Sequence, residues 1–289
     1  TVILDDRPWA QGAAVVLENA TGSVIALTGG LRSGLEGFVR ATQARRQPGS
    51  SFKPYVYAAA LANGHTQLDL ILDGPLSLPA GGGKTWRPGN YSGGFAGQVT
   101  LRAALARSLN TAAVRLILES GTDKTALLAR AMGVRTPLRT DPTIALGSSE
   151  VTPMDQAIGY ATIARGGTPT DPVYIERLVD IDGVEIGRAG GPLVVNGETI
   201  GSVPGGPLPR ALPPAMAYEL ADMLREVVRT GTARRAFKPG FDRAGKTGTT
   251  NDYVDAWFVG FTPRYTVAVW IGSDGTRSLG HGEAGGRTA

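Results

Sequence analysis

Three short motifs lie far apart along the chain, and the fold must bring them together for them to act as one site. They are Ser-x-x-Lys at 50–53, Ser-x-Asn at 108–110 and Lys-Thr-Gly-Thr at 246–249. The first puts a serine one helical turn from a lysine, because residues three apart share a helix face. The second places a serine and an amide on a separate loop, and the third predicts a strand as the far wall. The chain therefore has to fold around one cleft.

Each motif alone is weak evidence, because its residue types are common. Taken singly, Ser50 would be a helix cap, Ser108 a turn residue and Lys246 a surface charge. The use of lysine favours the joint interpretation. The 29 basic residues comprise five lysines and 24 arginines, and two of those five lysines fall within the motifs.

The composition excludes several classes of function. With 289 residues, 42% of them hydrophobic, the chain can bury a sizeable core. Its net charge of +4 comes from scattered arginines without a basic run, so nucleic-acid binding is not indicated. There is no cysteine, and His65 and His281 sit in separate glycine-flanked loops, so we expect no metal, no other cofactor and no Ser-His-Asp triad. No apolar stretch reaches the length of a membrane span, and no signal peptide is present.

Apolar residues in strand-like runs predict a sheet built from both ends of the chain. Residues 14–18 and 24–28 flank a glycine turn and predict a hairpin. Three further strands are predicted at 244–249, 255–261 and 265–273. Strands at both ends with helices between them indicate an α+β fold, with an antiparallel sheet of about five strands flanked by helices.

The middle of the chain predicts mostly helices. Ser50 is expected to cap a helix that ends at Gly64, and Thr100 and Asn110 to cap two more. Further helices are predicted at 122–133, 152–166 and 214–230, with small hairpins at 173–200. We expect an α/β subdomain from about 1–64 and 210–289, and an inserted, mainly helical subdomain at about 65–209.

The first motif fits nucleophilic catalysis by Ser50. A helix start would present its hydroxyl to solvent, with backbone N–H groups pointing at it. A lysine has an ordinary pKa of about 10.4 and is a poor base at neutral pH. The helix N-terminus, the charge of Lys246 and partial burial would each lower that value for Lys53. We therefore expect a largely neutral Lys53 to take the proton of Ser50.

The other motifs fit binding and proton relay. Ser108 can bridge the two lysines, and Asn110 can hold a peptide carbonyl of the substrate. Gly248 would let a substrate backbone approach the strand closely. The N–H groups of Thr249 and Ser50 could form an oxyanion hole. The hydroxyls of Thr247 and Thr249, together with Lys246, would meet a substrate carboxylate.

The sequence around the motifs resembles class A penicillin-binding proteins, the bifunctional peptidoglycan synthases. The similar segments are 46–54 (RQPGSSFKP), 99–110 (VTLRAALARSLN), 246–252 (KTGTTND) and 255–263 (DAWFVGFTP). This resemblance covers essentially the whole chain. It implies a penicillin-binding-protein/serine β-lactamase-like fold, with Ser50 rather than Ser51 as the nucleophile. It also implies that a loop carrying Trp86 and Tyr91 lies near the cleft.

The resemblance further implies a DD-transpeptidase. Such an enzyme is acylated by a D-Ala-D-Ala stem peptide, releases D-Ala and passes the acyl group to an amine on a neighbouring stem. β-Lactam antibiotics would inhibit it covalently. The expected location is the cell envelope, at the outer face of the cytoplasmic membrane and periplasmic in a Gram-negative, with other cell-wall synthesis proteins as possible partners.

Class A members also carry an N-terminal membrane helix, a glycosyltransferase domain and a C-terminal helix on the sheet. Residues 1–289 contain none of these, which predicts an excised transpeptidase domain, attached to a membrane only through an anchor that is absent here.

Two alternatives remain open. With water as the acceptor, the same chemistry would make a DD-carboxypeptidase or a β-lactamase. That reaction needs a base placed for water, and Glu150 is the nearest candidate by position, although the helix start before Thr152 explains it better. The second alternative is a non-catalytic domain that binds penicillin as a sensor or scaffold, against which the intact Ser50, Lys53 and Lys246 argue.

Overall fold

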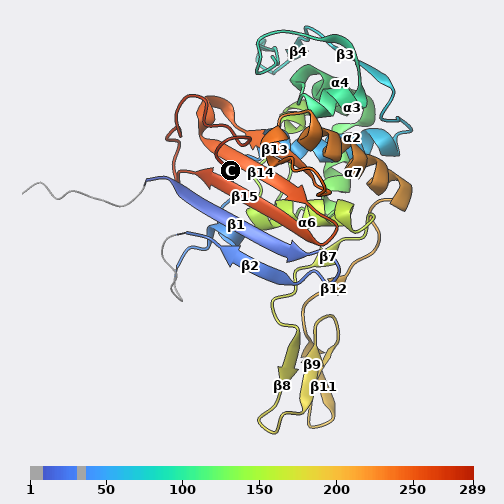
Figure 1. The fold of residues 1–289 in the computed structure, drawn as a ribbon, viewed down its shortest axis with the longest axis vertical. Helices are drawn as coiled ribbons and strands as arrows, with labels where there is room; N and C mark the ends of the chain where they lie inside the picture. Colours follow the sequence, from blue (N-terminus) through green and yellow to red (C-terminus); the bar gives the residue numbers. More distant parts are fainter. Residues whose placement is uncertain (1–8, 31–36) are drawn as a thin grey trace, which may run out of the picture.

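The computed structural model describes residues 9–30 and 37–289, and its centre is one antiparallel sheet built from both ends of the chain (Figure 1). The five strands follow the order β13-β14-β15-β1-β2. Their bounds are Gln11–Glu18 for β1, Val24–Thr28 for β2, Ala244–Thr249 for β13, Asp255–Phe261 for β14 and Tyr265–Gly272 for β15. The predicted α+β fold is confirmed. Parts of the predicted α/β subdomain, residues 1–8 and 31–36, lie outside the described residues.

One face of the sheet forms the floor of the core. Successive side chains of a strand point to opposite faces, and in β1 the buried ones are Ala13, Val15 and Leu17. Trp270 of β15 is buried on the same alternation. Helix α6 (Pro153–Ala164) packs against β1, β14 and β15. The alternation of buried and less buried side chains along β1 and β15 therefore shows which face of the sheet the helices cover.

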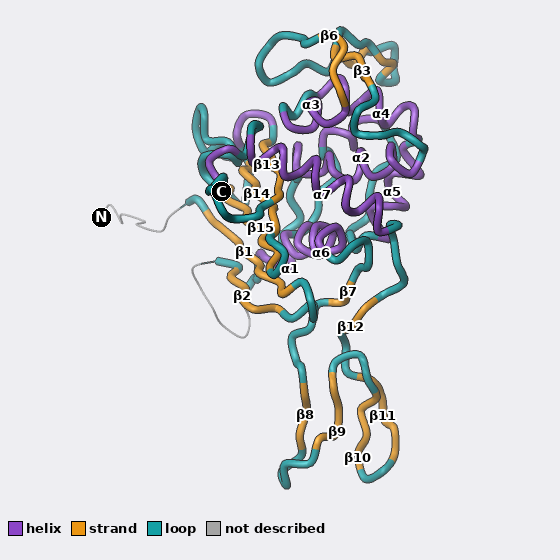
Figure 2. Tube along the Cα trace, turned by 45° about the vertical axis from the view of Figure 1, so that its right-hand side comes forward, coloured by secondary structure: helices purple, strands orange, loops and turns teal. Residues whose placement is uncertain are grey.

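Helix α2 (Lys53–Ala62) carries the first motif through the middle of the helical layer (Figures 1 and 2). Every residue from Lys53 to Leu61 is buried, as expected of a helix that is surrounded on all sides. Its neighbours are α4 (Asn110–Ser120), α5 (Thr122–Ala131) and α7 (Pro214–Arg229). Lys53 is thus carried into the interior by a helix without a solvent-exposed face.

Two predicted helix starts are confirmed by their caps. The Thr100 hydroxyl accepts the Ala103 N–H at 3.2 Å at the start of α3 (Leu101–Ala106). Helix α6 begins with a reciprocal pair, in which the Thr152 hydroxyl accepts the Asp155 N–H and the Asp155 carboxylate accepts the Thr152 N–H. Such a capping box satisfies two N–H groups that the helix itself leaves unpaired.

Two other predicted caps are wrong. Ser50 lies inside a 3₁₀ turn, η1 (Gly49–Phe52), that runs directly into α2, and the residue preceding α2 is Phe52. Asn110 is the first residue of α4, with Leu109 in the cap position. In both cases the polar side chain serves the cleft instead of the helix end, so a tertiary role replaces the local one.

Residues 65–209 contain both helices and strands. Near α3 and α4, β3 (Leu70–Asp73) pairs with β6 (Gly97–Thr100), and β4 (Leu78–Pro79) with β5 (Thr85–Trp86). At the far end a four-stranded extension, in the order β11-β10-β9-β8, projects from the body (Figure 2). Its strands are Arg177–Val179, Glu185–Arg188, Pro192–Val195 and Glu198–Ser202, and β7 (Thr170–Asp171) pairs with β12 (Gly206–Pro207) at its base.

The predicted hairpins are therefore confirmed, and the insert is helical only in part. Its treatment as a separate subdomain remains a prediction. The remaining short elements are α1 (Arg40–Gln43), η2 (Pro142–Leu146), η3 (Arg234–Ala236) and η4 (Asn251–Tyr253). Across residues 9–30 and 37–289, no helix combines the length and the hydrophobicity that crossing a membrane requires.

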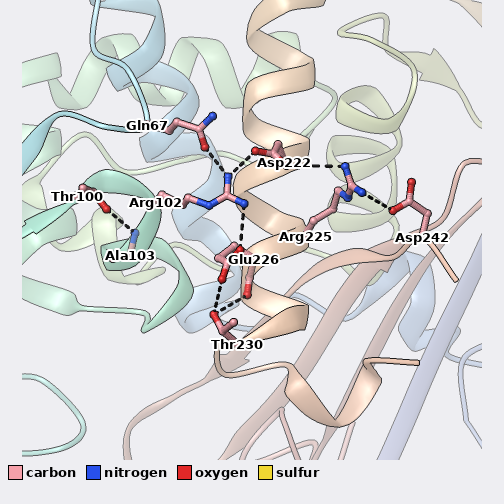
Figure 3. Close-up of polar contacts among 9 residues, drawn as sticks. All are labelled: Gln67, Thr100, Arg102, Ala103, Asp222, Arg225, Glu226, Thr230 and Asp242. Carbon is pink, nitrogen blue, oxygen red and sulfur yellow. Dashed lines mark hydrogen bonds and ion pairs between the residues drawn. The ribbon is translucent and has the colours of Figure 1, made fainter. Parts of the chain in front are cut away.

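Arg102 of α3 ties the insert to α7 (Figure 3). Its guanidinium donates to Gln67 Oε1 at 2.6 Å, to the Asp222 carboxylate, and to Glu226 Oε2 at 3.0 Å. The side chain is 24% exposed, and its carboxylate partners are similarly half-buried. Because α7 also packs against β13, this network holds the helices around the second motif in register with the strand of the third.

We predict that Arg102→Met lowers the free energy of unfolding by about 2–3 kcal/mol, because its charge-assisted hydrogen bonds are lost and the two half-buried carboxylates keep fewer partners, among them Arg225 and Thr230. Urea unfolding of both proteins measures the difference. Arg188→Met is the matched control: its ion pair with Glu185 is exposed, so stability should change little. Equal losses from the two substitutions would contradict a structural role for the Arg102 network.

Candidate active site

The two serines of the first motif have different surroundings. Ser50 lines a cleft of about 800 Å³ between the helical layer and the β13 end of the sheet. Ser51 is fully buried, where its Oγ donates to Pro48 O at 2.8 Å and accepts from Gln156 Nε2 at 2.9 Å. Ser51 therefore anchors the turn, while Ser50 lines the cleft, where a nucleophile has to be.

The Lys53 amine is buried and held by fixed acceptors. Its Nζ donates to Ser108 O at 2.6 Å and to Asn110 Oδ1 at 2.7 Å, and lies 3.3 Å from Ser108 Oγ. A neutral amine has two N–H bonds and one lone pair. With both N–H bonds of a neutral amine directed at carbonyl oxygens, the lone pair is left for a hydroxyl, as a general base requires, and the Ser108 hydroxyl lies within reach.

Ser108 lies between the two motif lysines. Lys246 Nζ donates to Ser108 Oγ at 2.9 Å and to Thr247 O at 3.1 Å. The backbone of Ser108 has φ 58°, a left-handed conformation that is unfavourable for a residue with a side chain. This conformation lets its carbonyl and its hydroxyl both face lysine amines, so the strain is linked to the site's geometry.

Burial sets the protonation of both amines. Lys53 and Lys246 are fully buried. Burial, and then the charge of Lys246, lower the pKa of Lys53 well below its usual range, while the Asp73 carboxylate opposes the shift. Burial alone lowers the pKa of Lys246 to about 7. A lowered pKa makes the neutral, proton-accepting form of Lys53 more accessible, so the structure supports the expected base.

The exposed edge of β13 faces the nucleophile turn. The Thr250 N–H donates to Asp255 O on β14 at 3.1 Å. Because backbone N–H groups alternate in direction along a strand, the Thr249 N–H points away from β14. Gly49 lies beside it: a Cβ added there would stand 2.5 Å from Thr249 O. The strand and the turn are thus in close contact beside Ser50.

The reason for glycine at 248 differs from the one expected. A Cβ at Gly248 would lie 2.2 Å from Pro48 O and 3.0 Å from Ser51 Oγ. The missing side chain therefore makes room for the nucleophile turn, and Gly248 is not among the described residues that line the cleft. The expectation of close substrate approach is replaced by close packing of two protein segments.

The other predicted contact residues fall into two groups. Asn110, Thr247 and Thr249 line the cleft with Ser50 and Ser108. Lys246 is buried beneath it and reaches Ser108. The Thr247 hydroxyl lies 2.8 Å from that of Thr232, and Thr249 Oγ1 accepts the Gly285 N–H at 3.1 Å.

The two aromatic candidates are separated. Tyr91 lines the cleft and is 76% exposed. Its hydroxyl meets that of Tyr253 on the opposite wall at 2.6 Å. Trp86 is half-buried against the hydrophobic core and is not among the described cleft residues. Only Tyr91 of this pair is therefore placed to touch a ligand.

One residue next to the site, Asp255, was not identified by the sequence analysis. Asp255 accepts from Arg46 Nε at 2.7 Å and from Trp270 Nε1 at 2.9 Å, and its N–H donates to Thr250 Oγ1. It thereby joins the segment before Ser50 to the end of β13. Asp255 stood in one of the segments that carried the family resemblance, but a single carboxylate in a strand has no motif of its own.

The cleft offers no alternative catalytic centre of the usual kinds. Neither His65 nor His281 is among its described lining residues. Within the described part of the chain, no group of three His, Asp or Glu could hold a metal ion. A second cavity of about 290 Å³, between α6, α7 and β14, contains none of the motif residues.

Comparison with known proteins agrees with this arrangement. A family model described as the penicillin binding protein transpeptidase domain matches residues 12–287. The chain belongs to this family. Penicillin-binding protein 1A of Neisseria flavescens is 42% identical over 293 residues, which cover 100% of this chain and 36% of that protein. Penicillin-binding protein 1A of Pseudomonas aeruginosa is 35% identical over 320 residues, covering 98% and 39%. The resemblance to class A penicillin-binding proteins is confirmed, and the chain spans little more than a third of these relatives.

Solved structures give the same result. Penicillin-binding protein 1A from Haemophilus influenzae superposes with a TM-score of 0.86 at 32% identity, over 98% of this chain and 46% of that one. The Mycobacterium tuberculosis protein PonA1 in complex with penicillin V gives 0.81 at 27% identity, over 98% and 76%. An imipenem acyl-enzyme complex of penicillin-binding protein A from M. tuberculosis gives 0.74 at 25% identity, over 94% and 70%. The penicillin-binding-protein fold is therefore confirmed.

The two lysines predict a bell-shaped pH profile for acylation by a penicillin. The rate should rise with pH as Lys53 loses its proton, and fall above about 7 as Lys246 loses the charge that attracts the ligand's carboxylate. In Lys246→Arg the charge persists at every accessible pH, so the falling limb should disappear while the rising limb remains. Stopped-flow acylation rates across pH measure both limbs. A falling limb that survives in Lys246→Arg would assign it to another group.

Proposed function

We propose that this transpeptidase domain is a serine-type DD-transpeptidase that cross-links peptidoglycan. The carrying observation is a cleft-facing Ser50 followed one turn later by Lys53, whose amine is buried and oriented by two carbonyl acceptors. Its donor would be a stem peptide ending in D-Ala-D-Ala, and its acceptor an amine of a second stem.

Acylation would begin with transfer of the Ser50 proton to Lys53 as Oγ attacks the carbonyl carbon of the penultimate D-Ala. The oxyanion would be stabilised by the N–H groups of Ser50 and Thr249. As the peptide bond breaks, the leaving D-Ala amine needs a proton. Ser108, which lies between both lysine amines, would pass it on. The product is an ester on Ser50 and free D-Ala.

Transfer repeats these steps in reverse with a new amine. The acceptor amine attacks the ester, its proton passes through the same lysine–serine network, and Ser50 leaves with its hydroxyl restored. Lys246 and the Thr247 and Thr249 hydroxyls would hold the carboxylate of the donor's terminal D-Ala. Thr247 and Thr249 line the cleft beside Ser50, which supports this assignment.

β-Lactams would acylate the same serine. Their strained amide resembles the D-Ala-D-Ala bond, and the ring stays attached after opening. Two of the similar solved structures are described as a penicillin V complex and an imipenem acyl-enzyme complex. Those ligands belong to those proteins, and the shared fold supports the same reaction here.

The cleft disfavours water as the main acceptor. Hydrolysis of the ester needs a base that activates water. Asp252 is the one carboxylate among the described residues that line the cleft, and Glu150 is not among them. A carboxypeptidase or β-lactamase would thus have to depend on Asp252 or a lysine. A non-catalytic scaffold is disfavoured, because burying two lysines lowers stability and a scaffold has no use for them.

We also propose a site of action at the outer face of the cytoplasmic membrane, where peptidoglycan is made. Partners there would be the stem peptides and other cell-wall synthesis proteins. Both proposals rest on the relatives being penicillin-binding proteins 1A.

A fluorescent penicillin should form one stable adduct, located by intact mass and peptide mapping on Ser50. Ser50→Ala should abolish it. Ser51→Ala should retain it, since the Ser51 hydroxyl is buried and occupied by Pro48 and Gln156. Rapid turnover without an adduct would indicate a β-lactamase, and the absence of both adduct and turnover would indicate a non-catalytic domain.

The acceptor can be tested with a D-Ala-D-Ala thioester or peptide donor and an added D-amino acid. Transfer to the amine should exceed hydrolysis at millimolar acceptor, as mass spectrometry of the two products would show. Asp252→Asn should leave that ratio unchanged. A ratio dominated by hydrolysis, and reversed by Asp252→Asn, would make the enzyme a carboxypeptidase.

A further inference from the structure

A buried carboxylate lies behind the cleft without a part in the proposed reaction. Asp73, the last residue of β3, is fully buried and accepts four hydrogen bonds. Asn90 Nδ2 approaches both carboxylate oxygens at 2.9 Å, the Ala96 N–H donates at 2.8 Å, and Thr111 Oγ1 donates at 2.5 Å. Burial alone would raise the pKa of Asp73, but these hydrogen bonds and the charge of Arg107 outweigh it and hold the pKa below its usual value.

An ionised carboxylate accepts hydrogen bonds and donates none. The amide of Asn90 must therefore turn its Nδ2 toward Asp73, and Nδ2 also donates to Gly94 O at 2.9 Å. Its Oδ1 is then left facing the other way, where it accepts the Asn110 N–H at 2.7 Å. Asp73 thus fixes which end of the Asn90 amide meets the start of α4.

The contacts continue from the Asn90 loop through Asn110 to Lys53. Asn110 Nδ2 donates to Gly89 O, the carbonyl next to Asn90, at 2.7 Å. This bond leaves Asn110 Oδ1 to accept from Lys53 Nζ at 2.7 Å. Asp73 therefore holds Asn90 in place, Asn90 accepts the backbone N–H of Asn110, and the carbonyl next to Asn90 accepts the Asn110 amide whose oxygen holds the Lys53 amine.

We propose that Asp73 and Asn90 are positioning residues for acylation, and that they orient the Asn110 amide so that its oxygen holds the Lys53 amine with a lone pair free for the serine hydroxyl. This inference rests on the proposed function, since it assigns the residues to the acylation step. Asp73 is buried behind the cleft and Asn90 lines it, and in this proposal both act on the reaction through Asn110.

Asp73→Asn is a nearly isosteric test. Its new NH₂ group would face donors already in place, either the Ala96 N–H or Asn90 Nδ2. Turning the Asn90 amide to relieve this conflict would direct Nδ2 at the Asn110 N–H. Either arrangement loosens the Asn110 oxygen, and we expect acylation by a penicillin to slow about ten- to hundredfold, the range for small displacements of a reacting group.

Asn90→Ala removes the connecting amide from a loop with a smaller risk to folding. It should slow acylation to a similar extent. In the double variant Asp73→Asn/Asn90→Ala the loss should be no larger than in either single variant, because both act through the same path. Rates that multiply would show that the two residues act independently and would overturn the proposal.

A control variant and the pH profile distinguish a purely structural role of Asp73 from the proposed positioning role. Thr111→Val removes a hydrogen bond from the same carboxylate but lies off the path to Lys53, so acylation should stay within about threefold of wild type, far from the displacement effect. Loss similar to that in Asp73→Asn would mean that only the anchoring of Asp73 matters.

The pH profile adds a readout that misfolding does not change. Two charges act on the pKa of Lys53: Lys246 on β13 lowers it and Asp73 on β3 raises it. Arg107 at the end of α3 lowers the pKa of Asp73. The Asp73 charge also raises the pKa of the buried Tyr57 on α2. Removing the Asp73 charge lowers the pKa of Lys53 further, so the rising limb should move to lower pH in Asp73→Asn. In Asn90→Ala the charge remains and the limb should stay in place.

Acylation rates from stopped-flow measurements on wild type, the three single variants and the double variant decide the matter. A wild type that is never acylated would overturn the proposed function, whatever the variants do. A wild type that is acylated, with Asp73→Asn and Asn90→Ala at the same rate, would leave the function standing and overturn this inference alone.

Discussion

The rest of the structure depends on the burial of two lysine amines around one serine. Lys53 and Lys246 are both removed from water and both reach Ser108. Burying an amine is costly for its charged form, so burial lowers the pKa of both amines and favours their neutral forms. A solvent-exposed lysine could not do this. The fold must therefore supply a dry interior next to a cleft that is open to a peptide.

Three segments meet this requirement in different ways. Helix α2 carries Lys53 in from its N-terminus and has no exposed face. Strand β13 stands at the edge of the sheet, so it can deliver Lys246 inward while Thr247 and Thr249 line the cleft. The α3–α4 connection places Ser108 between them, at the cost of a left-handed residue. Asp255 joins the first two segments and the Arg102 network joins the third to the rest (Figure 3).

Local sequence patterns predicted most of the strands and helix starts, but they failed for residues whose side chains contact partners distant in the sequence. Alternation gave the strands, and Thr100 and Thr152 gave helix starts, because each signal and its structure lie within a few residues. Ser50 and Asn110 carried equally good capping signals, yet their side chains serve the cleft. Asp73 and Asn90 had no local signal, because their environment is assembled from β3, the following loop and α4.

The choice of lysine makes the orientation of neighbouring amides part of the chemistry. A histidine base is neutral near pH 7 by its own pKa and needs only one partner to fix its tautomer. A neutral lysine amine rotates freely about its last bond, and its lone pair points at a hydroxyl only when both N–H bonds are directed elsewhere. Ser108 O and Asn110 Oδ1 provide those directions. An amide can present oxygen or nitrogen at the same place, so the orientation of Asn110 has to be fixed by its own partners, and Gly89 O fixes it by accepting from Nδ2. In the proposed reaction Asp73 would support the lysine base indirectly, because it holds Asn90 and with it the loop that carries this carbonyl.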